Sequence, residues 1–355
     1  AAFNHMHIFI DPNPDAASSY VERERLFNLP GCTWDDYNKD LISEGGAIFS
    51  RHSKSIKLTP QIKKMLGTQK QTMSPIDLMQ AILKMKVDLL WNGGIGTYVK
   101  GSKETHLEVG DRANDALRIN GKELNARIVG EGGNLGLTQL GRIEFGAKGG
   151  RINTDAVDNA GGVDCSDNEV NIKILLNGLV QNGDLTVKQR NKILYDMTDE
   201  VGDIVIDDCY RQTHSLSITE LRGGGQLKEQ SQFITELERS GKLDRSLEFI
   251  PSDEEIAERL ALGKGLTRPE LSVLLAYNKM VLKEELVCPE ITDNEYHQSL
   301  LIEAFPKQLQ DNYSAQMQEH PLRAEIIATQ LANNIGNDMG FNFVHRMKAE
   351  TGATT

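Results

Sequence analysis

Short apolar runs alternate with helical patterns in the first half of the chain. Runs typical of strands occupy residues 7–10, 87–91, 127–129 and 151–153. Ser74 is placed to cap a helix that begins with Pro75, and Ile143 and Phe145 indicate a second helix. Strand–helix–strand alternation favours parallel strands with crossover helices. We therefore predict an α/β fold, a partial Rossmann-like parallel sheet with flanking helices.

Beyond residue 175 the strand signals nearly vanish. Apolar positions follow a helical period over residues 193–209, from Thr267 onward, and over residues 319–337. The run Gly223-Gly224-Gly225 indicates a flexible loop between helices. The pattern predicts two domains, with the sheet in residues 1–175 and an all-α helical region in residues 176–355.

The composition is that of a globular protein, with 355 residues of which 39% are hydrophobic and 25% charged. No run approaches the ~18 apolar residues of a membrane span, so we expect no membrane partner. The four cysteines match neither a zinc site nor a disulfide framework, which favours reduced thiols in a cytoplasmic protein. His5 and His7 would share one face of a strand, but no further ligand is evident, and we expect no metal.

The net charge of −12 argues against a nucleic-acid partner. Residues 1–175 are nearly neutral, whereas residues 176–355 carry 18 basic and 29 acidic side chains. The first half is therefore the better place for an anionic ligand. The chain also begins with Ala1 rather than Met, directly in an apolar run, so we expect it to be cut from a longer one.

Asp11 directly follows the first predicted strand. An acidic residue at a strand end of a dinucleotide fold accepts hydrogen bonds from the adenosine ribose and disfavours a 2′-phosphate. The alternative is an Asp-Pro turn that caps the backbone. The glycine-rich turn that should precede such an aspartate by roughly 20 residues is absent, because only ten residues come before it.

Glycine-rich loops follow the later strands. The loop 92–96 exposes backbone N–H groups that suit a flat ring or a phosphate, although simple turns use the same residues. The loop 131–134 ends in Asn134, and Asn159 begins a further glycine-rich stretch; an asparagine amide can bind a ribose hydroxyl or a nicotinamide. Asp164 or Ser166 is a plausible helix N-cap there, and such a helix start would attract a carboxylate.

Several of these motifs resemble one family. EGGN at 131–134 and NAGGVDCSDNE at 159–169 resemble the end of the nucleotide domain in amino-acid dehydrogenases. The stretches AAFNHMHIFIDPNPD, DLLWNGGIGTYVK and GDRANDALRINGKEL are similar to the large, multidomain NAD-dependent glutamate dehydrogenases of bacteria. This resemblance runs from residue 1 into the acidic helical half.

The resemblance implies NAD as cofactor and glutamate as substrate. The residues it places at the cofactor are Asp11, Asn92, Gly93, Gly94, Asn134 and Asn159. Asp11 would hold the adenosine ribose, Asn134 and Asn159 would lie near the nicotinamide and its ribose, and Ser166 would bind a carboxylate of glutamate. The catalytic lysine and aspartate of the family lie upstream of the nucleotide domain, so we assign no catalytic residue in this chain.

We therefore expect residues 1–175 to be an NAD-binding domain without its glycine-rich segment, within an enzyme that converts L-glutamate reversibly to 2-oxoglutarate and ammonia. The isolated chain should be inactive, and the full-length enzyme should be a homo-oligomer. The alternative is a non-catalytic nucleotide-binding module or a helical assembly module.

Overall fold

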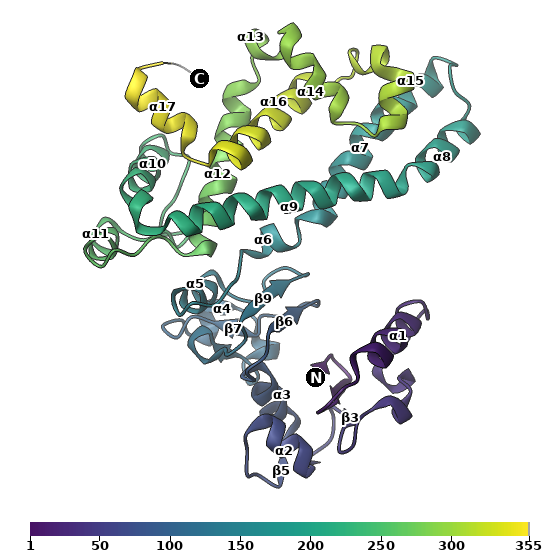
Figure 1. Ribbon diagram of the computed structural model, residues 1–355, viewed down its shortest axis with the longest axis vertical. Helices are drawn as coiled ribbons and strands as arrows, with labels where there is room; N and C mark the ends of the chain where they lie inside the picture. Colours follow the sequence, from purple (N-terminus) through teal and green to yellow (C-terminus); the bar gives the residue numbers. More distant parts are fainter. Residues whose placement is uncertain (354–355) are drawn as a thin grey trace. The chain divides into compact units, whose positions relative to one another are not determined.

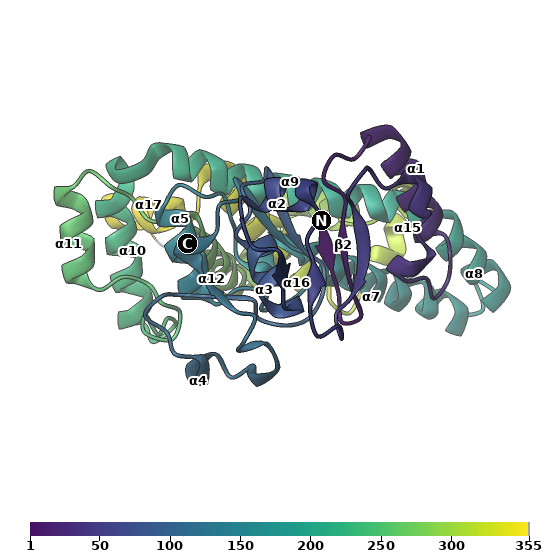
Figure 2. The same ribbon diagram turned by 90° about the horizontal axis from the view of Figure 1, so that it is seen from below.

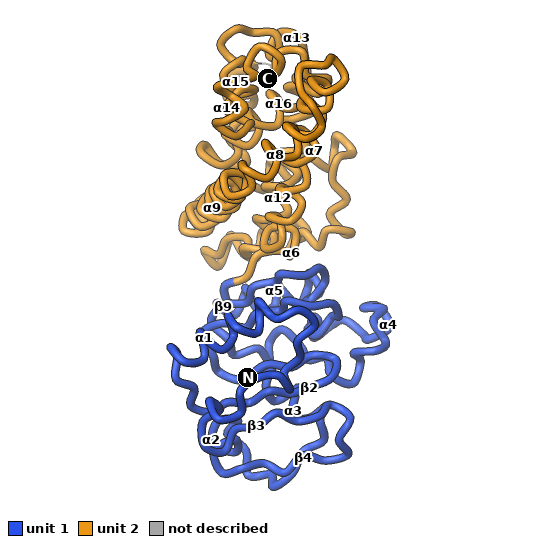
Figure 3. Tube along the Cα trace, turned by 90° about the vertical axis from the view of Figure 1, so that its right-hand side faces the viewer, with its two compact units in different colours: residues 1–151 blue, residues 152–355 orange. Residues whose placement is uncertain are grey.

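The structure, a computed structural model, describes residues 1–353. The chain divides into two compact units, Ala1–Arg151 and Ile152–Thr355 (Figure 3). The change in composition falls near residue 175, inside the helix Ala160–Gln181, which belongs wholly to the second unit. This helix buries Ile172 and Leu176 in the core of the second unit, so it cannot be divided at residue 175.

The first unit is a mixed α/β structure made of short elements. Its strands are β1 Ala2–Phe3, β2 His7–Ile10, β3 Ala47–Ser50, β4 Ile56–Lys57, β5 Thr72–Met73, β6 Leu89–Asn92, β7 Val99–Lys100, β8 Ile119–Asn120 and β9 Ile128–Glu131. Its α-helices are α1 Ala16–Phe27, α2 Pro60–Leu66, α3 Pro75–Leu83, α4 His106–Val109 and α5 Gln139–Ala147. Four 3₁₀ turns complete it: η1 Trp34–Asp36, η2 Lys39–Leu41, η3 Arg112–Asn114 and η4 Gly121–Glu123.

The strands form four small sheets over the described residues rather than one extended sheet. The predicted parallel pairing is confirmed for β6 with β9, and β7 also pairs with β8 in parallel. Arg151 adds only a single parallel bridge, to Ile128. For β2 the expectation is wrong, because β2 lies antiparallel between β1 and β3. The Asn4 side chain accepts the amides of Met6 (2.8 Å) and His7 (2.7 Å), and this tight turn folds β1 back on β2.

Other local predictions for this unit are confirmed. β2 has the predicted bounds and is buried along its whole length. The Ser74 hydroxyl caps α3 by accepting the amide of Asp77 at 3.1 Å, and Pro75 is the first helical residue. Phe145 lies on α5 and is buried. These features depend on residues that are neighbours in the chain, so the local sequence is sufficient to predict them.

The second unit is all helical. Its α-helices are α6 Asp155–Asp158, α7 Ala160–Gln181, α8 Val187–Asp196, α9 Thr198–Arg222, α10 Leu227–Arg239, α11 Asp253–Ala261, α12 Arg268–Leu286, α13 Pro289–Thr292, α14 Gln298–Glu303, α15 Lys307–Met317, α16 Arg323–Asn334 and α17 Phe343–Thr351. The 3₁₀ turns η5 Gly223–Gln226 and η6 Glu295–His297 and the π turn η7 Ile335–Met339 join them.

Helix α12 lies at the centre of the second unit, against α16 and the long helix α9 (Figures 1 and 2). It begins where the sequence predicts, after Thr267, whose backbone amide and hydroxyl both donate to the carboxylate of Glu270. Glu270 is 1% exposed and also accepts two hydrogen bonds from Arg259, at 2.7 and 2.8 Å. The helix start is thus joined to α11 by a paired, buried carboxylate.

Three helical expectations need correction. The predicted helix over 193–209 is interrupted at Met197, which ends α8 and begins α9. The glycine run 223–225, predicted as a flexible loop, forms the 3₁₀ turn η5, and it packs closely on Gly263, since a Cβ on Gly224 would lie 2.7 Å from the carbonyl oxygen of Gly263. The helix predicted over 319–337 starts at Arg323 and changes to a π turn at Ile335. Among the described helices, none combines the length and apolar character needed to cross a membrane.

Candidate cofactor site at the strand ends

The carboxyl ends of β6 and β9 bring two of the predicted loops together. In this parallel pair Asn92 lies opposite Glu131, and the amide of Gly132 donates to the carbonyl of Asn92 at 2.8 Å. The loop that begins with Gly93 therefore runs beside the loop that carries Asn134. Ligands of α/β folds bind at such strand ends.

Most glycines of these loops are explained by contacts within the chain. A Cβ on Gly130 or Gly132 would lie 2.8 or 2.6 Å from the ring of Trp91, and a Cβ on Gly133 would lie 2.7 Å from the carbonyl oxygen of Gly94. These distances are shorter than carbon–carbon or carbon–oxygen contacts allow. Gly94 differs, because a Cβ there would meet nothing within 4 Å. Gly94 therefore faces open space.

A buried ion pair holds the second loop. The guanidinium of Arg142 on α5 donates to both carboxylate oxygens of Glu131, at 2.7 and 3.0 Å, and both side chains are buried. Glu131 also accepts the amide of Leu137 at 3.1 Å. Sequence reasoning missed this pair, although an acidic residue at a strand end followed by an arginine on the next helix is a signal that could have suggested it.

The side chain of Asn92 lies against Gly94 and Gly136. Its Oδ1 accepts the amide of Gly94 at 3.4 Å, whereas its Nδ2 is buried without a hydrogen-bond partner among the described residues. Gly136 makes room for this amide, since a Cβ at that position would overlap Nδ2. A buried N–H group without a partner is costly, so Asn92 has a donor available to a ligand.

Asn134 itself is exposed, and the residue after it is unusual. Leu135 has a φ of 58°, in the left-handed region that side chains other than glycine, asparagine and aspartate rarely adopt. The hydroxyl of Thr97 donates to the carbonyl of Leu135 at 2.7 Å and helps to hold this conformation. Backbone strain of this kind is often found at binding sites.

Asp11 ends β2 and is 5% exposed. Its Oδ1 accepts hydrogen bonds from the hydroxyl and the amide of Ser43. Its Oδ2 is buried and has no partner among the described residues. Asp11 thus has one acceptor satisfied by the protein and one available. Because β2 pairs with β1 and β3, Asp11 belongs to a different small sheet from Asn92 and Asn134.

Asn159 and Ser166 lie in the second unit. Asn159 joins α6 to α7, and α7 starts at Ala160. The expected N-caps are wrong, since Asp164 and Ser166 lie inside this helix and the glycines before them are helical too. Ser166 is exposed on α7.

Two lysines, Lys100 in the first unit and Lys173 in the second, are held by contacts within the chain. Lys100 is buried, and its ammonium donates to the carbonyls of Gly101 (3.1 Å) and Glu104 (2.7 Å) and to Oδ1 of Asn120 (2.8 Å). All three protons of this ammonium are therefore used in holding the chain. In the second unit, Lys173 pairs with Glu169 one turn earlier on α7.

Comparison with known proteins relates the chain to one enzyme family. Residues 1–219 match the family described as bacterial NAD-glutamate dehydrogenase, catalytic domain, and residues 263–355 match glutamate dehydrogenase, C-terminal. The chain is 57% identical over 352 residues to a protein of Pseudomonas aeruginosa and 56% identical over 352 residues to one of Halomonas elongata, each match covering 99% of the chain. It is 45% identical over 360 residues to a protein of Mycobacterium tuberculosis, which covers 100% of the chain.

All three relatives are named NAD-specific glutamate dehydrogenase, and the chain spans 22% of the length of each. The match to the catalytic-domain family covers more than half of the chain and contains both strand-end loops, Asp11, Asn159 and Ser166. The chain therefore belongs to the bacterial NAD-glutamate dehydrogenase family.

Proposed function

We propose that the chain supplies the cofactor cleft and a substrate-facing helix of an NAD-dependent glutamate dehydrogenase. The reaction is the reversible oxidative deamination of L-glutamate to 2-oxoglutarate and ammonia, in which NAD accepts the hydride. The observation that carries this proposal is the pair of buried polar atoms without partners at predicted positions, Oδ2 of Asp11 and Nδ2 of Asn92. A ligand that bonds them would remove the cost of leaving them unsatisfied.

One of the two atoms is a hydrogen-bond acceptor and the other a donor, and NAD can bond both. A carboxylate oxygen accepts from a ribose hydroxyl, so Asp11 would hold the adenosine ribose and would disfavour a 2′-phosphate. The Asn92 amide would donate to an acceptor of the cofactor, with Gly93 and Gly94 admitting it closely because Gly94 faces open space. Asn134 and Asn159 would orient the nicotinamide and its ribose, and Ser166 would donate to a carboxylate of glutamate.

We further propose that the first unit becomes Rossmann-like when another strand of the parent enzyme joins it. Among the described residues β6 pairs only with β9, so its other edge has free backbone groups. Leu89 and Trp91 on this strand are 55% and 60% exposed, which is unusual for large apolar side chains of a parallel sheet. A strand at this edge would pair with the free backbone groups of β6. The parent enzyme is expected to be a cytoplasmic homo-oligomer.

The test is NADH binding by the intact parent enzyme. Asp11→Ala removes a charged acceptor, so the dissociation constant should rise by about 10- to 100-fold, equivalent to ~1.5–3 kcal/mol. The control is Asp40→Asn, which changes an exposed aspartate of the same unit and should leave binding unchanged. An Asp11 variant that binds NADH as the wild type does would contradict the proposal and favour an assembly module instead.

We also expect the pure 355-residue chain to show no turnover of glutamate with NAD, because the resemblance places the catalytic lysine and aspartate upstream of the nucleotide domain. Measurable turnover by this chain would show that the catalytic groups lie within it.

A further inference from the structure

The second unit contains a pocket lined by polar side chains from four helices and the π turn. Its volume is about 110 Å³, well above the ~10–15 Å³ that one water needs. Its lining residues are Ala160, Asp164, Asp208, Cys209, Gln212, Lys279, Asn333 and Asn337. The pocket thus has room for a ligand of several heavy atoms.

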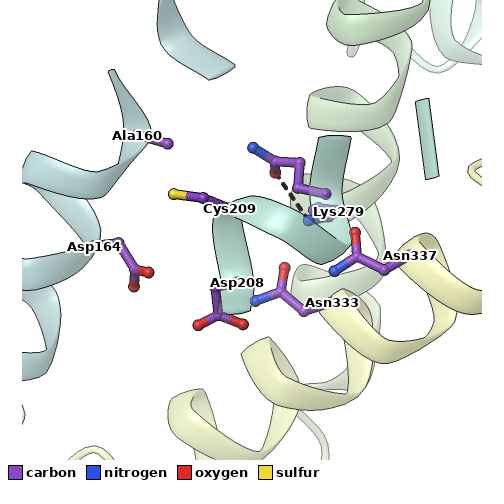
Figure 4. A pocket seen from close by; sticks show the side chains of 8 residues that line it. Ala160, Asp164, Asp208, Cys209, Lys279, Asn333 and Asn337 are labelled. Atoms are coloured by element: carbon purple, nitrogen blue, oxygen red, sulfur yellow. Dashed lines mark hydrogen bonds between the residues drawn. The ribbon is translucent and has the colours of Figure 1, made fainter. Parts of the chain in front are cut away.

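The spacing of these residues explains why they converge. Asn333 lies near the end of α16, and Asn337 follows it in the π turn η7. Ala160 and Asp164 on α7, and Asp208 and Gln212 on α9, are each separated by four residues. Residues at this spacing share one face of a helix. Helices α7 and α9 therefore each present one face to the same cavity, and Lys279 on α12 lies across it from Asp164 (Figure 4).

The charges in this pocket are not paired with each other. The ammonium of Lys279 donates to the neutral Oε1 of Gln212 at 3.0 Å, and no ion pair within 4.0 Å joins it to a carboxylate of the described residues. Oδ1 of Asp164 accepts a hydrogen bond from the side-chain amide Nδ2 of Asn168 at 3.1 Å, whereas its Oδ2 is buried without a partner among the described residues. Figure 4 shows Asp164 and Asp208 on one side of the cavity and Lys279 on the other.

Asn337 gives an independent indication of a ligand. It is 8% exposed, it lines the pocket, and its Oδ1 has no hydrogen-bond partner among the described residues. It lies in the π turn η7, and π turns within helices are frequent at functional sites. A buried amide oxygen at the pocket wall is an acceptor for an ammonium or a hydroxyl.

Because Lys279 and Asp164 are partly buried without an ion-pair partner among the described residues, their pKa values differ from the ordinary ones. Desolvation lowers the pKa of Lys279 to about 8, although Asp208 and Asp164 oppose this shift. Desolvation, followed by repulsion from Asp208, raises the pKa of Asp164 to about 6. Each charge is therefore unfavourable in the empty pocket, and a ligand with charges of both signs would stabilise both.

We propose that this pocket binds a small zwitterion, a free α-amino acid, with its ammonium at Asp164 and Asp208 and its carboxylate at Lys279, on the side of the cavity that also carries Asn337 (Figure 4). The opposite charges on the two sides of the cavity match the two ends of such a ligand. Ser166 lies two residues beyond Asp164 and thus on the other side of α7, since successive helix residues turn by 100°. The pocket is therefore a second site, separate from the position proposed for the glutamate carboxylate.

Calorimetric titration of the whole 355-residue chain tests this proposal with three probes. Glycine carries both charges, methylammonium carries only the positive one, and acetate only the negative one. We expect glycine to bind at least about tenfold more tightly than either single-charge probe, the effect of one charge-assisted hydrogen bond. Equal binding of the three probes, or no binding of glycine, would overturn the proposal.

Two variants locate the binding. Lys279→Met should weaken glycine binding by about tenfold or more, and it removes a desolvated charge, so the chain should remain folded. The matched control is Lys283→Met, one turn further on α12, where the side chain is exposed. Ser166→Ala should leave glycine binding unchanged. Binding that is lost in Ser166→Ala, or retained in Lys279→Met, would contradict a site in this pocket.

Discussion

The guanidinium of Arg142 holds the carboxylate of Glu131 with two hydrogen bonds, Nε to Oε2 at 2.7 Å and Nη2 to Oε1 at 3.0 Å. This pair ties the end of β9 to α5 and fixes the loop that carries Asn134. The loop thus owes its position to a buried ion pair, and its glycines serve the close approach of Trp91 and Gly94.

Glu131→Gln should destabilise the chain by about 3–5 kcal/mol, because it leaves the buried guanidinium of Arg142 without a counter-ion. Urea unfolding measures this difference. The control is Asp88→Asn, which breaks the pair of Asp88 with Arg127, whose side chains are 85% and 78% exposed, and should cost about 0–1 kcal/mol. Equal losses in the two variants would show that the buried pair has no special role.

Gly133→Ala should lower the stability of the fold, whereas Gly94→Ala should leave stability unchanged and weaken cofactor binding. Alanine at 133 places a Cβ 2.7 Å from the Gly94 carbonyl, so the loops must move and the unfolding free energy should fall by about 1–3 kcal/mol. Alanine at 94 meets no atom of the chain, and stability should remain within about 0.5 kcal/mol.

In the parent enzyme, however, Gly94→Ala should weaken NADH binding, because the new methyl group occupies the surface proposed for the cofactor. Unchanged NADH affinity in this variant, measured by fluorescence titration, would place the cofactor elsewhere.

The carboxyl of Asp164 should make stability depend on pH. Its folded pKa of about 6 lies above the ordinary value of 3.8, so its favourable contribution is complete below pH 3.8 and is lost as pH rises through 6. Asp164→Asn should therefore increase the unfolding free energy relative to wild type. This increase should be about 1–2 kcal/mol larger at pH 7 than at pH 4. Denaturant titrations at both pH values provide the measurement.

Asp203→Asn, an exposed change on α9, should show no such difference between the two pH values. A pH-independent effect of Asp164→Asn would indicate that this carboxyl titrates normally.

Ser166→Ala in the parent enzyme should raise KM for glutamate by about tenfold, since it removes a hydrogen bond to a charged carboxylate. The KM for NAD should change little, because the serine is assigned to the substrate alone. Steady-state kinetics with both substrates varied gives both constants. Ser299→Ala on α14 is an exposed serine control. An unchanged KM for glutamate would remove Ser166 from the site.

The parts predicted correctly from the sequence depend on neighbouring residues. Ser74 and Pro75 define the start of α3, and Thr267 defines that of α12, because capping involves only the first helical turn. The burial pattern of His7–Ile10 likewise gives β2 its bounds. What β2 pairs with was not predictable in this way, since its partner β3 lies far along the chain and is only partly buried.

At the candidate site, too, local features were predictable from the sequence and contacts between distant residues were not. The sequence pattern predicted that Asn92 and the loop 131–134 each follow a strand, and the parallel register of β6 and β9 brings them together. Gly161 and Gly162 suggested an open turn, yet both are helical, since packing of α7 against α9 outweighs the low helix propensity of glycine. The polar pocket around Lys279 was invisible because its residues come from helices distant in sequence.

The most direct test of the central claim is an experimental structure of the intact parent enzyme with NADH. We expect an adenosine ribose hydroxyl within about 2.5–3.0 Å of the Asp11 carboxylate, and the nicotinamide end at Asn134 and Asn159. NADH bound with no contact to Asp11, Asn92 or Asn134 would contradict it.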